Sequence, residues 1–324
     1  MKDKCIVTGG MGFIGSAVVE NLLNLKFKVI NIDKLTYAAN RDNLKRFKIY
    51  KNHFFYKIDI TDQKKISYIF KKYKPKYVFN LAAESHVDNS INEPKSFINT
   101  NILGTYNLLV EANKLHLKKY DIKFVQISTD EVYGDLYKKK TPSKEGDPYI
   151  PSSPYSASKA SADHLVRSWS RTYGLKYNIT CSANNYGPYQ NKEKLIPVII
   201  KNLLNKRKIP IYGNGLQKRN WVYVEDNAEA IIKVALNGKI NSTYNIATNN
   251  EHTNKYMVEK IYDILSKKFS LNKKSKIIKN VKDRPGHDIV YKINFDKIQK
   301  DLQWKPKINF ENSLKKTIEW YTKK

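Results

Sequence analysis

Two short stretches of the sequence carry side chains that could perform acid–base chemistry. The first contains Thr129-Asp130-Glu131 and follows the apolar run Phe124 to Ile127, which predicts a buried strand. The second places Tyr155 four residues before Lys159, so that a phenol and an ammonium lie on one face of a predicted helix. Because ligands of an open parallel α/β sheet bind at the carboxyl ends of its strands, we expect these five side chains to share one site.

Tyr155 and Lys159 are suited to removing the proton of an alcohol whose hydride leaves for a nicotinamide. The pKa of a tyrosine in water is about 10, and a neighbouring ammonium stabilises the phenolate and lowers this pKa. Asp130 and Glu131 add a carboxyl pair, and two carboxyls in unlike environments can hold opposite protonation states, one as an acid and one as a base. The alternative for this pair is a turn and a helix cap.

The elements that must position these groups begin with a glycine turn. The apolar strand Lys4 to Thr8 leads into Gly9, Gly12 and Gly15, and a helical pattern follows from Ala17 to Leu25. Free backbone N–H groups at such a helix start bind phosphate, so the pattern predicts a dinucleotide site. The next strand, Lys28 to Ile32, ends in Asp33, whose carboxylate favours NAD over NADP. Lys34 and Arg41 are the basic residues that could favour NADP instead.

Strands and helices then alternate, which predicts a doubly wound parallel (Rossmann) α/β sheet. We expect strands His53 to Ile58 and Tyr77 to Leu81, and helices Gln63 to Tyr73 and Pro94 to Leu115. Among the later segments, we expect strands or extended runs at Asn178 to Ala183, Ile209 to Tyr212, Val222 to Val224 and Tyr244 to Ala247. We expect helices at Lys194 to Asn205 and Asn254 to Phe269, and a loop at Asp283 to His287.

The predicted organisation is a nucleotide-binding domain with a smaller α/β carboxyl-terminal domain. We expect residues 1–183 and about 218–250 to form the NAD-binding part, and about 184–217 and 251–324 to form the part that binds the substrate. The net charge of +29 comes mainly from scattered lysines without interleaved aromatic residues, so we expect no nucleic-acid partner. Two distant cysteines, no signal peptide and no apolar run of membrane length predict a cytoplasmic protein that does not bind membranes.

The sequence resembles the extended short-chain dehydrogenase/reductase family, through Gly9, Gly12, Gly15, Asp33, Asp59 and the pair Tyr155 and Lys159. Within that family, Thr129-Asp130-Glu131 is similar to the nucleoside-diphosphate-glucose 4,6-dehydratases, which are lyases. The likeness covers nearly the whole chain, through Asn184 to Tyr189, Glu193 to Pro197, Pro210 to Gly213 and Asp283 to His287.

The resemblance implies a reaction in three stages on dTDP-glucose or UDP-glucose, with NAD as a recycled cofactor. Tyr155 takes the C4 hydroxyl proton as hydride passes to NAD, with Thr129 on the C4 oxygen. Glu131 then removes the C5 proton, Asp130 protonates the departing C6 hydroxyl, and hydride returns to C6. The product is a 4-keto-6-deoxy sugar nucleotide for rhamnose-type biosynthesis. The resemblance also implies a homodimer, packed through the helix Pro94 to Leu115 and the helix bearing Tyr155.

The resemblance assigns further residues to the two ligands. Those implied for the cofactor are Gly9, Gly12, Phe13, Ile14, Gly15, Asp33, Lys34, Leu35, Thr36, Asp59, Ile60, Leu81, Ala82, Ala83, Ser85, Thr100, Tyr155, Lys159 and Asn185. Those implied for the sugar nucleotide are Ser85, Thr129, Asn184, Lys194, Leu195, Pro210, Tyr212, Arg219, Asn254, Arg284 and His287, and no metal is implied.

Three alternatives stay open. A nucleotide-sugar 4-epimerase lacks the Asp-Glu pair, and a decarboxylase needs a pocket for a substrate carboxylate. The third is a non-catalytic dinucleotide-sensing or nucleic-acid-binding protein. Such a protein is expected to have lost catalytic residues, whereas all five are present in this sequence. His86 and Asp88 could also be acid–base groups, although a loop histidine is more often only hydrogen-bonded.

Overall fold

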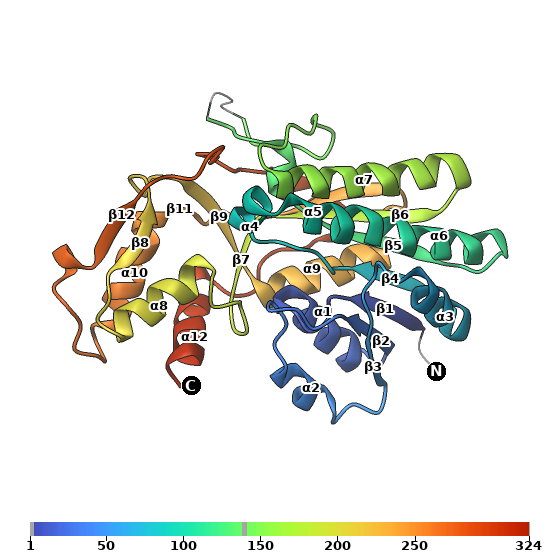
Figure 1. Ribbon diagram of the computed structural model, residues 1–324, viewed down its shortest axis with the longest axis horizontal. Helices are drawn as coiled ribbons and strands as arrows, with labels where there is room; N and C mark the ends of the chain where they lie inside the picture. The colour runs from blue at the N-terminus through green and yellow to red at the C-terminus, as the bar shows by residue number, and fades with distance from the viewer. Residues whose placement is uncertain (1–2, 138–140, 324) are drawn as a thin grey trace.

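The computed structural model describes residues 3–137 and 141–323 and has a seven-stranded sheet at its centre (Figure 1). The strand order is β10-β6-β5-β4-β1-β2-β3, and every pairing is parallel. The strands are β1 (Lys4–Thr8), β2 (Lys28–Asp33), β3 (His53–Lys57), β4 (Tyr77–Asn80), β5 (Lys123–Thr129), β6 (Lys176–Ser182) and β10 (Ser242–Ile246). The chain reverses its direction of travel across the sheet between β3 and β4, which places the carboxyl ends of β1 and β4 at the switch point.

Helices cover both faces of this sheet, as the doubly wound prediction requires (Figure 1). Helices α1 (Phe13–Asn24) and α9 (Val224–Asn237) pack together on one face. Helices α3 (Gln63–Tyr73), α6 (Gly104–Leu117) and α7 (Pro154–Tyr173) form a layer on the other face. The central strands are therefore shielded on both faces, and β1 from Cys5 to Val7 is completely buried, whereas the edge strand β3 is only partly buried.

Local signals fix the start and the end of α7, the helix that carries Tyr155 and Lys159. The Ser153 hydroxyl accepts a hydrogen bond from the Ser156 amide while the Ser156 hydroxyl accepts one from the Ser153 amide, which is a reciprocal capping box. Pro154 occupies the first turn, and Gly174 ends the helix in a left-handed conformation. Tyr155 therefore lies in the first turn and Lys159 one turn later.

A second, smaller assembly packs beside the main sheet, at the left of Figure 1. It contains the three-stranded sheet β11-β9-β7 and the parallel pair β12-β8. Its apolar core joins residues of α8, α10 and α12, among them Ile200, Ile261 and Leu314. The elements are β7 (Asn184–Tyr186), α8 (Leu195–Leu204), β8 (Ile209–Tyr212), β9 (Lys218–Tyr223), β11 (Glu251–Thr253), α10 (Asn254–Leu265), β12 (Ile278–Val281) and α12 (Phe310–Thr322).

Three segments differ from the sequence-based expectation. Val224 begins α9 instead of ending a strand, and the whole of α9 was not predicted. The expected helix Pro94 to Leu115 is divided into α5 (Pro94–Phe97), a π-helical segment (Ile98–Leu103) and α6. β5 extends to Thr129, so that Asp130 and Glu131 open a short 3-10 helix, Asp130–Tyr133.

The remaining helices are short: α2 (Asp42–Phe47), α4 (Val87–Asn92) and α11 (Asp296–Leu302), with a 3-10 turn at Lys274–Lys276. Within residues 3–137 and 141–323, no helix has both the length and the apolar character that a membrane span requires.

Candidate active site

The glycine turn after β1 has a geometry that only glycine tolerates. Gly9 has φ +70°, and a Cβ on it would lie 2.7 Å from the Ala82 amide nitrogen. A Cβ on Gly15 would lie 2.1 Å from the Gly9 carbonyl oxygen. Gly12 caps α1 without a side-chain hydrogen bond, so the amides of the first helical turn stay available for an anion. These features fit the pyrophosphate of a dinucleotide.

Asp33 ends β2 beside this turn, as predicted, and two backbone amides hold its carboxylate. Met11 donates to it over 3.0 Å and Leu35 over 2.7 Å. Lys34 points toward two other carboxylates, at 3.3 Å from Glu84 and 3.7 Å from Asp59. Because its charge is already balanced there, Lys34 is a poor partner for the 2′-phosphate of NADP. The arrangement therefore fits NAD better.

One cavity of about 300 Å³ joins the glycine turn to the predicted catalytic residues. It contains all five catalytic candidates: Thr129, Asp130, Glu131, Tyr155 and Lys159. It is also lined by Gly9, Gly12, Phe13, Ile14, Gly15, Asp33, Lys34, Thr36, Asp59, Ile60, Leu81, Ala82, Ala83, Ser85, Thr100, Asn184, Asn185 and Lys194. The cavity therefore brings together most residues that the sequence suggested, from segments far apart in the chain.

Other lining residues were not predicted. They include Ala38 and Ala39 after β2, Glu84 beside the predicted Ser85, and Gln190, Asn191 and Glu193 in the loop before α8. Glu193 begins a stretch that carried the family likeness, and Glu84 directly follows the predicted cofactor residues Leu81, Ala82 and Ala83, so their neighbours were the available signal. Nothing in the local pattern distinguishes Ala38 and Ala39 from ordinary loop residues.

Thr129, Asp130 and Glu131 lie where β5 ends and the 3-10 helix begins. The Thr129 hydroxyl donates to Asp130 over 3.3 Å and accepts the Glu131 amide over 3.3 Å. The second oxygen of Asp130 is buried and has no hydrogen-bond partner among the described residues. The Tyr291 hydroxyl lies 3.5 Å from Glu131. Thr129 therefore caps the helix as well as facing the cavity, so the cap and the site are compatible.

The two carboxyls have raised pKa values for partly different reasons. Burial, and next the negative charge of Glu131, raise the pKa of Asp130 to about 7. Burial also raises the pKa of Glu131, but Arg219 and Lys194 oppose this shift. Near neutral pH, Asp130 can therefore hold a proton. The two cations favour ionisation of Glu131, against burial and the charge of Asp288. The assignment of Asp130 as the acid and Glu131 as the base stays a prediction.

The pKa of Tyr155 differs from the expectation that its surroundings lower it. Burial and the charge of Glu131 raise this pKa, while Thr129 lowers it. Lys159 is 5% exposed, and its ammonium donates to the Ile127 carbonyl oxygen over 2.5 Å. Burial lowers the pKa of Lys159, whereas Asp163 raises it. The protein groups alone thus favour a neutral phenol at Tyr155.

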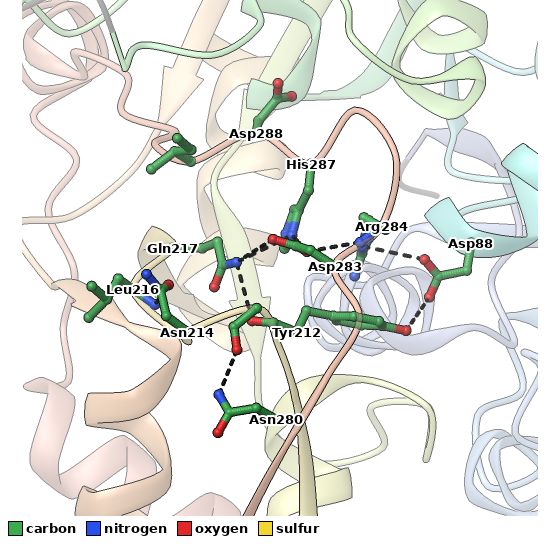
Figure 2. A network of polar contacts seen from close by, with 12 residues as sticks. Asp88, Tyr212, Asn214, Leu216, Gln217, Asn280, Asp283, Arg284, His287 and Asp288 are labelled. Carbon is green, nitrogen blue, oxygen red and sulfur yellow. Dashed lines mark hydrogen bonds and ion pairs between the residues drawn. The ribbon is translucent and has the colours of Figure 1, made fainter.

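His86 and Asp88, the other acid–base candidates, have structural contacts. The Nδ1 atom of His86 accepts the Asn89 amide over 3.3 Å and so caps α4. Asp88 contacts Tyr212 and Arg284 (Figure 2). Neither residue lines the cavity among the described residues. These contacts favour hydrogen-bonding and ion-pairing roles.

The expected residues for the substrate nucleotide are divided between the cavity and a second cluster. Lys194 lines the cavity, and its ammonium donates to the Ser85 carbonyl over 3.0 Å. Outside the lining lie the cofactor candidate Leu35 and the substrate candidates Leu195, Pro210, Tyr212, Arg219, Asn254, Arg284 and His287. Leu195 opens α8, Asn254 opens α10, and Pro210 lies in β8.

Arginine and histidine side chains meet in this second cluster (Figure 2). An Arg219 terminal nitrogen lies 3.3 Å from His287 Nε2, and His287 Nδ1 lies 2.6 Å from Asp283. The Gln217 amide nitrogen lies 3.2 Å from the same carboxylate. Charge links the cluster to the catalytic carboxyls, since Arg219 lowers the pKa values of both Asp130 and Glu131. The cluster thus supplies cations beside the cavity.

The chain has a doubly wound sheet with a glycine turn, and a helix with the Tyr-x-x-x-Lys spacing faces the same cavity. These features place it in the short-chain dehydrogenase/reductase class. The comparison with known families is more specific. The chain belongs to the family described as GDP-mannose 4,6 dehydratase, whose model matches residues 6–317.

Known proteins similar to the chain include a dTDP-glucose 4,6-dehydratase of Haemophilus influenzae, 48% identical over 98% of the chain and 97% of the relative. The dTDP-glucose 4,6-dehydratase 1 of Escherichia coli K12 is 48% identical over 98% and 92%. The crystal structure of DesIV, a dTDP-glucose 4,6-dehydratase of Streptomyces venezuelae with NAD bound, has a TM-score of 0.92 and 37% identity over 99% and 97%. The UDP-glucose 4-epimerase of Thermotoga maritima has a TM-score of 0.88 and 31% identity over 99% of both chains. The overall shape is thus shared by dehydratases and epimerases.

Proposed function

We propose that this chain is a dTDP-glucose 4,6-dehydratase, a hydro-lyase that converts dTDP-glucose to dTDP-4-keto-6-deoxyglucose. The observation that carries this proposal is the pair Asp130 and Glu131 in one cavity with Tyr155, with the pKa of Asp130 raised to about 7. A dehydration needs an acid and a base on neighbouring carbons, and this pair can supply both. The relatives of known name, at 48% identity, support the choice of substrate.

The glycine turn and Asp33 would hold NAD, with the pyrophosphate at the start of α1 and the adenosine ribose at the Asp33 carboxylate. When bound, NAD would supply the hydride acceptor for C4 of the sugar and the donor for C6. DesIV, which was solved with NAD, supports this choice of cofactor.

Tyr155 would take the proton of the C4 hydroxyl, with the Thr129 hydroxyl donating to the C4 oxygen. The protein groups raise the pKa of Tyr155. Tyr155 can therefore act as a base only when nearby positive charges stabilise its phenolate. These charges are the ammonium of Lys159 one helical turn away and the nicotinamide ring.

The C4 ketone acidifies the C5 proton, and Glu131 would remove this proton as the base. Asp130 would donate its proton to the departing C6 hydroxyl, which leaves as water. When C6 receives its hydride, Glu131 would return the proton to C5. The unpartnered buried oxygen of Asp130 supports this role, because a proton held there has no other acceptor among the described residues. Burial favours the neutral form that an acid requires.

Arg219, Arg284, His287, Lys194 and Asn254 would bind the nucleotide and its diphosphate, with Asn184, Leu195, Pro210 and Tyr212 beside them. The cluster of cations outside the cavity supports this assignment, since guanidinium groups match phosphate oxygens. The sugar nucleotide would be held by residues about 184–217 and 251–324, and NAD by residues 1–183 and about 218–250.

A homodimer in the cytoplasm completes the proposal. Ile98, Leu103 and Tyr106 are between 40% and 50% exposed on the π-helical segment and α6, which supports an interface there. The two cysteines, Cys5 and Cys181, are free, which suits a reducing compartment. A purely monomeric species in sedimentation at micromolar concentration would contradict the dimer.

Incubation of the protein and NAD with dTDP-glucose, and separately with UDP-glucose, tests the activity and the nucleobase together. We expect dTDP-glucose to lose the mass of one water and to give a product with the alkaline absorbance of a 4-keto-6-deoxy sugar. An epimerase would leave the mass unchanged. Turnover of UDP-glucose in preference to dTDP-glucose would correct the nucleobase.

A further inference from the structure

Asp88 connects the cofactor side of the molecule to the cluster of arginine and histidine side chains. It lies in the first turn of α4, which directly follows the cavity-lining residues Leu81 to Ser85. Its Oδ2 atom accepts a hydrogen bond from the Tyr212 hydroxyl over 3.0 Å, and its Oδ1 atom lies 3.4 Å from Arg284 Nε (Figure 2). One carboxylate therefore holds two side chains from the smaller assembly.

These contacts fix the direction of the Arg284 side chain. The guanidinium carbon lies 4.7 Å from the centre of the Tyr212 ring, so Asp88 binds both members of a stacked pair. The contact with Asp88 is an ion pair and not a hydrogen bond, because the Arg284 Nε N–H has no hydrogen-bond partner among the described residues. A guanidinium group carries five N–H groups, so those on the two terminal nitrogens can be offered to phosphate oxygens.

The backbone of the same loop is held independently. The Asp283 carboxylate accepts the Arg284 amide over 2.9 Å and contacts His287 and Gln217. These contacts fix where the Arg284 backbone lies but not where its long side chain points. The position of the guanidinium group therefore depends on Asp88 and Tyr212.

We infer that Asp88 is a positioning residue for substrate binding, which orients Arg284 toward the diphosphate through its contacts with Arg284 Nε and the Tyr212 hydroxyl. This inference rests on the proposed function. The side chains of Asp88 and Arg284 are 29% and 22% exposed, so the pair is partly shielded from solvent and can be preorganised. A carboxylate also repels a diphosphate, so removing it without any positioning effect would strengthen binding.

Loss of positioning weakens dTDP binding and loss of charge repulsion strengthens it, so removal of Asp88 distinguishes the two effects. The NAD-loaded protein is titrated calorimetrically with dTDP, and its kcat and KM are measured with dTDP-glucose. We expect Asp88→Ala to weaken dTDP binding and raise KM about tenfold, with kcat changed less than about threefold. Tyr212→Phe, which keeps the ring and removes the hydroxyl, should weaken binding in the same direction by a smaller factor. The control is Asp121→Ala, which removes a carboxylate paired with Lys176 over 2.8 Å beside the amino-terminal ends of β5 and β6.

The Arg284→Ala background decides whether Asp88 acts through Arg284. In that background, Asp88→Ala should no longer weaken dTDP binding. The inference is overturned if Asp88→Ala binds dTDP as tightly as the wild type or more tightly. It is also overturned if Asp88→Ala weakens dTDP binding by the same factor in the Arg284→Ala background as in the wild type. If Asp88→Ala does not fold, Asp88→Asn decides by the same criterion, because the amide oxygen can still accept from Tyr212 but the charge is lost. A wild-type protein that neither binds dTDP nor converts dTDP-glucose overturns the proposed function itself, together with this inference.

Discussion

The ammonium group of Lys159 donates a hydrogen bond to the Ile127 carbonyl oxygen over 2.5 Å and so ties α7 to the strand that ends in Thr129. Lys159 is 5% exposed and Asp130 is 3% exposed, so both titratable groups are buried. A buried charge acts strongly on its neighbours, since little water screens it. The Thr129 hydroxyl lowers the pKa of Tyr155 against burial and Glu131. We expect the fixed ammonium, one helical turn away, to favour the Tyr155 phenolate as well.

Replacement of Lys159 by methionine should lower kcat about 100-fold, because the Tyr155 phenolate then loses a buried cation. The remaining activity should rise with pH, since the pKa of Tyr155 is raised further. A pH profile of kcat measures both effects. The matched control is Lys123→Met, which removes an ammonium that also donates to a backbone carbonyl, that of Ala235 over 2.9 Å, outside the residues that line the cavity. Equal losses in the two variants would contradict the role of Lys159.

Asp130 should impose an alkaline limit on the reaction. A general acid must be protonated, and the pKa of Asp130 is raised to about 7. The rate of water elimination in the wild-type protein should therefore fall as pH rises through about 7. Asp130→Asn should lower that rate about 100-fold at pH 6. A single-turnover measurement of water loss, with a profile that stays flat from pH 6 to 9, would contradict the assignment.

The same carboxyl makes the stability of the fold depend on pH. Its pKa is 3.8 in its ordinary state and about 7 in the fold, so between these values the folded chain holds a proton that the unfolded chain releases. The free energy of unfolding should thus fall as pH rises from about 4 to about 7, by at most about 4 kcal/mol from this group. Thermal unfolding at pH 4.5 and pH 8 measures it. Asp130→Asn should be more stable than the wild type at pH 8 but not at pH 4.5, and the reverse order would contradict the burial of a neutral acid.

Gly15 should tolerate no side chain. Alanine usually stabilises a helix relative to glycine, yet here its Cβ would lie 2.1 Å from the Gly9 carbonyl oxygen. Gly15→Ala should therefore destabilise the fold by about 2 kcal/mol or more and weaken NAD binding at least tenfold. Gly146→Ala is the control, since no described atom lies within 4 Å of its added Cβ. Its free energy of unfolding should stay within about 0.5 kcal/mol of the wild-type value. Denaturant unfolding and NAD titration compare the two, and equal behaviour would contradict the tight turn.

Much of the first half of the fold and the reacting groups could be predicted because their signals are local. The glycine turn, Asp33 and the Tyr155–Lys159 spacing each lie within one strand–turn–helix unit, and the structure places them around one cavity. Helix α9 was missed because the apolar residues Val222 and Val224 suggested a strand, whereas the strand ends at Tyr223. Its buried positions Ala228, Ile231, Ile232 and Ala235 have helical spacing, which was the available signal.

Contacts between distant segments could not be predicted, because no local pattern encodes them. The contact of Asp88 with Tyr212 spans 124 positions, and that of Glu131 with Tyr291 spans 160. The raised pKa of Tyr155 likewise follows from burial, which depends on how the segments pack. The sequence therefore indicated which side chains share the cavity better than it indicated their surroundings.

The route of the C4 hydrogen tests the central claim most directly. The protein with NAD is incubated with dTDP-glucose deuterated at C4, and the product is analysed by mass spectrometry and NMR. A dehydratase that recycles its cofactor should lose one water and carry the deuterium in the C6 methyl group of the product. Deuterium that stays at C4 of a sugar nucleotide of unchanged mass would contradict the account and favour an epimerase.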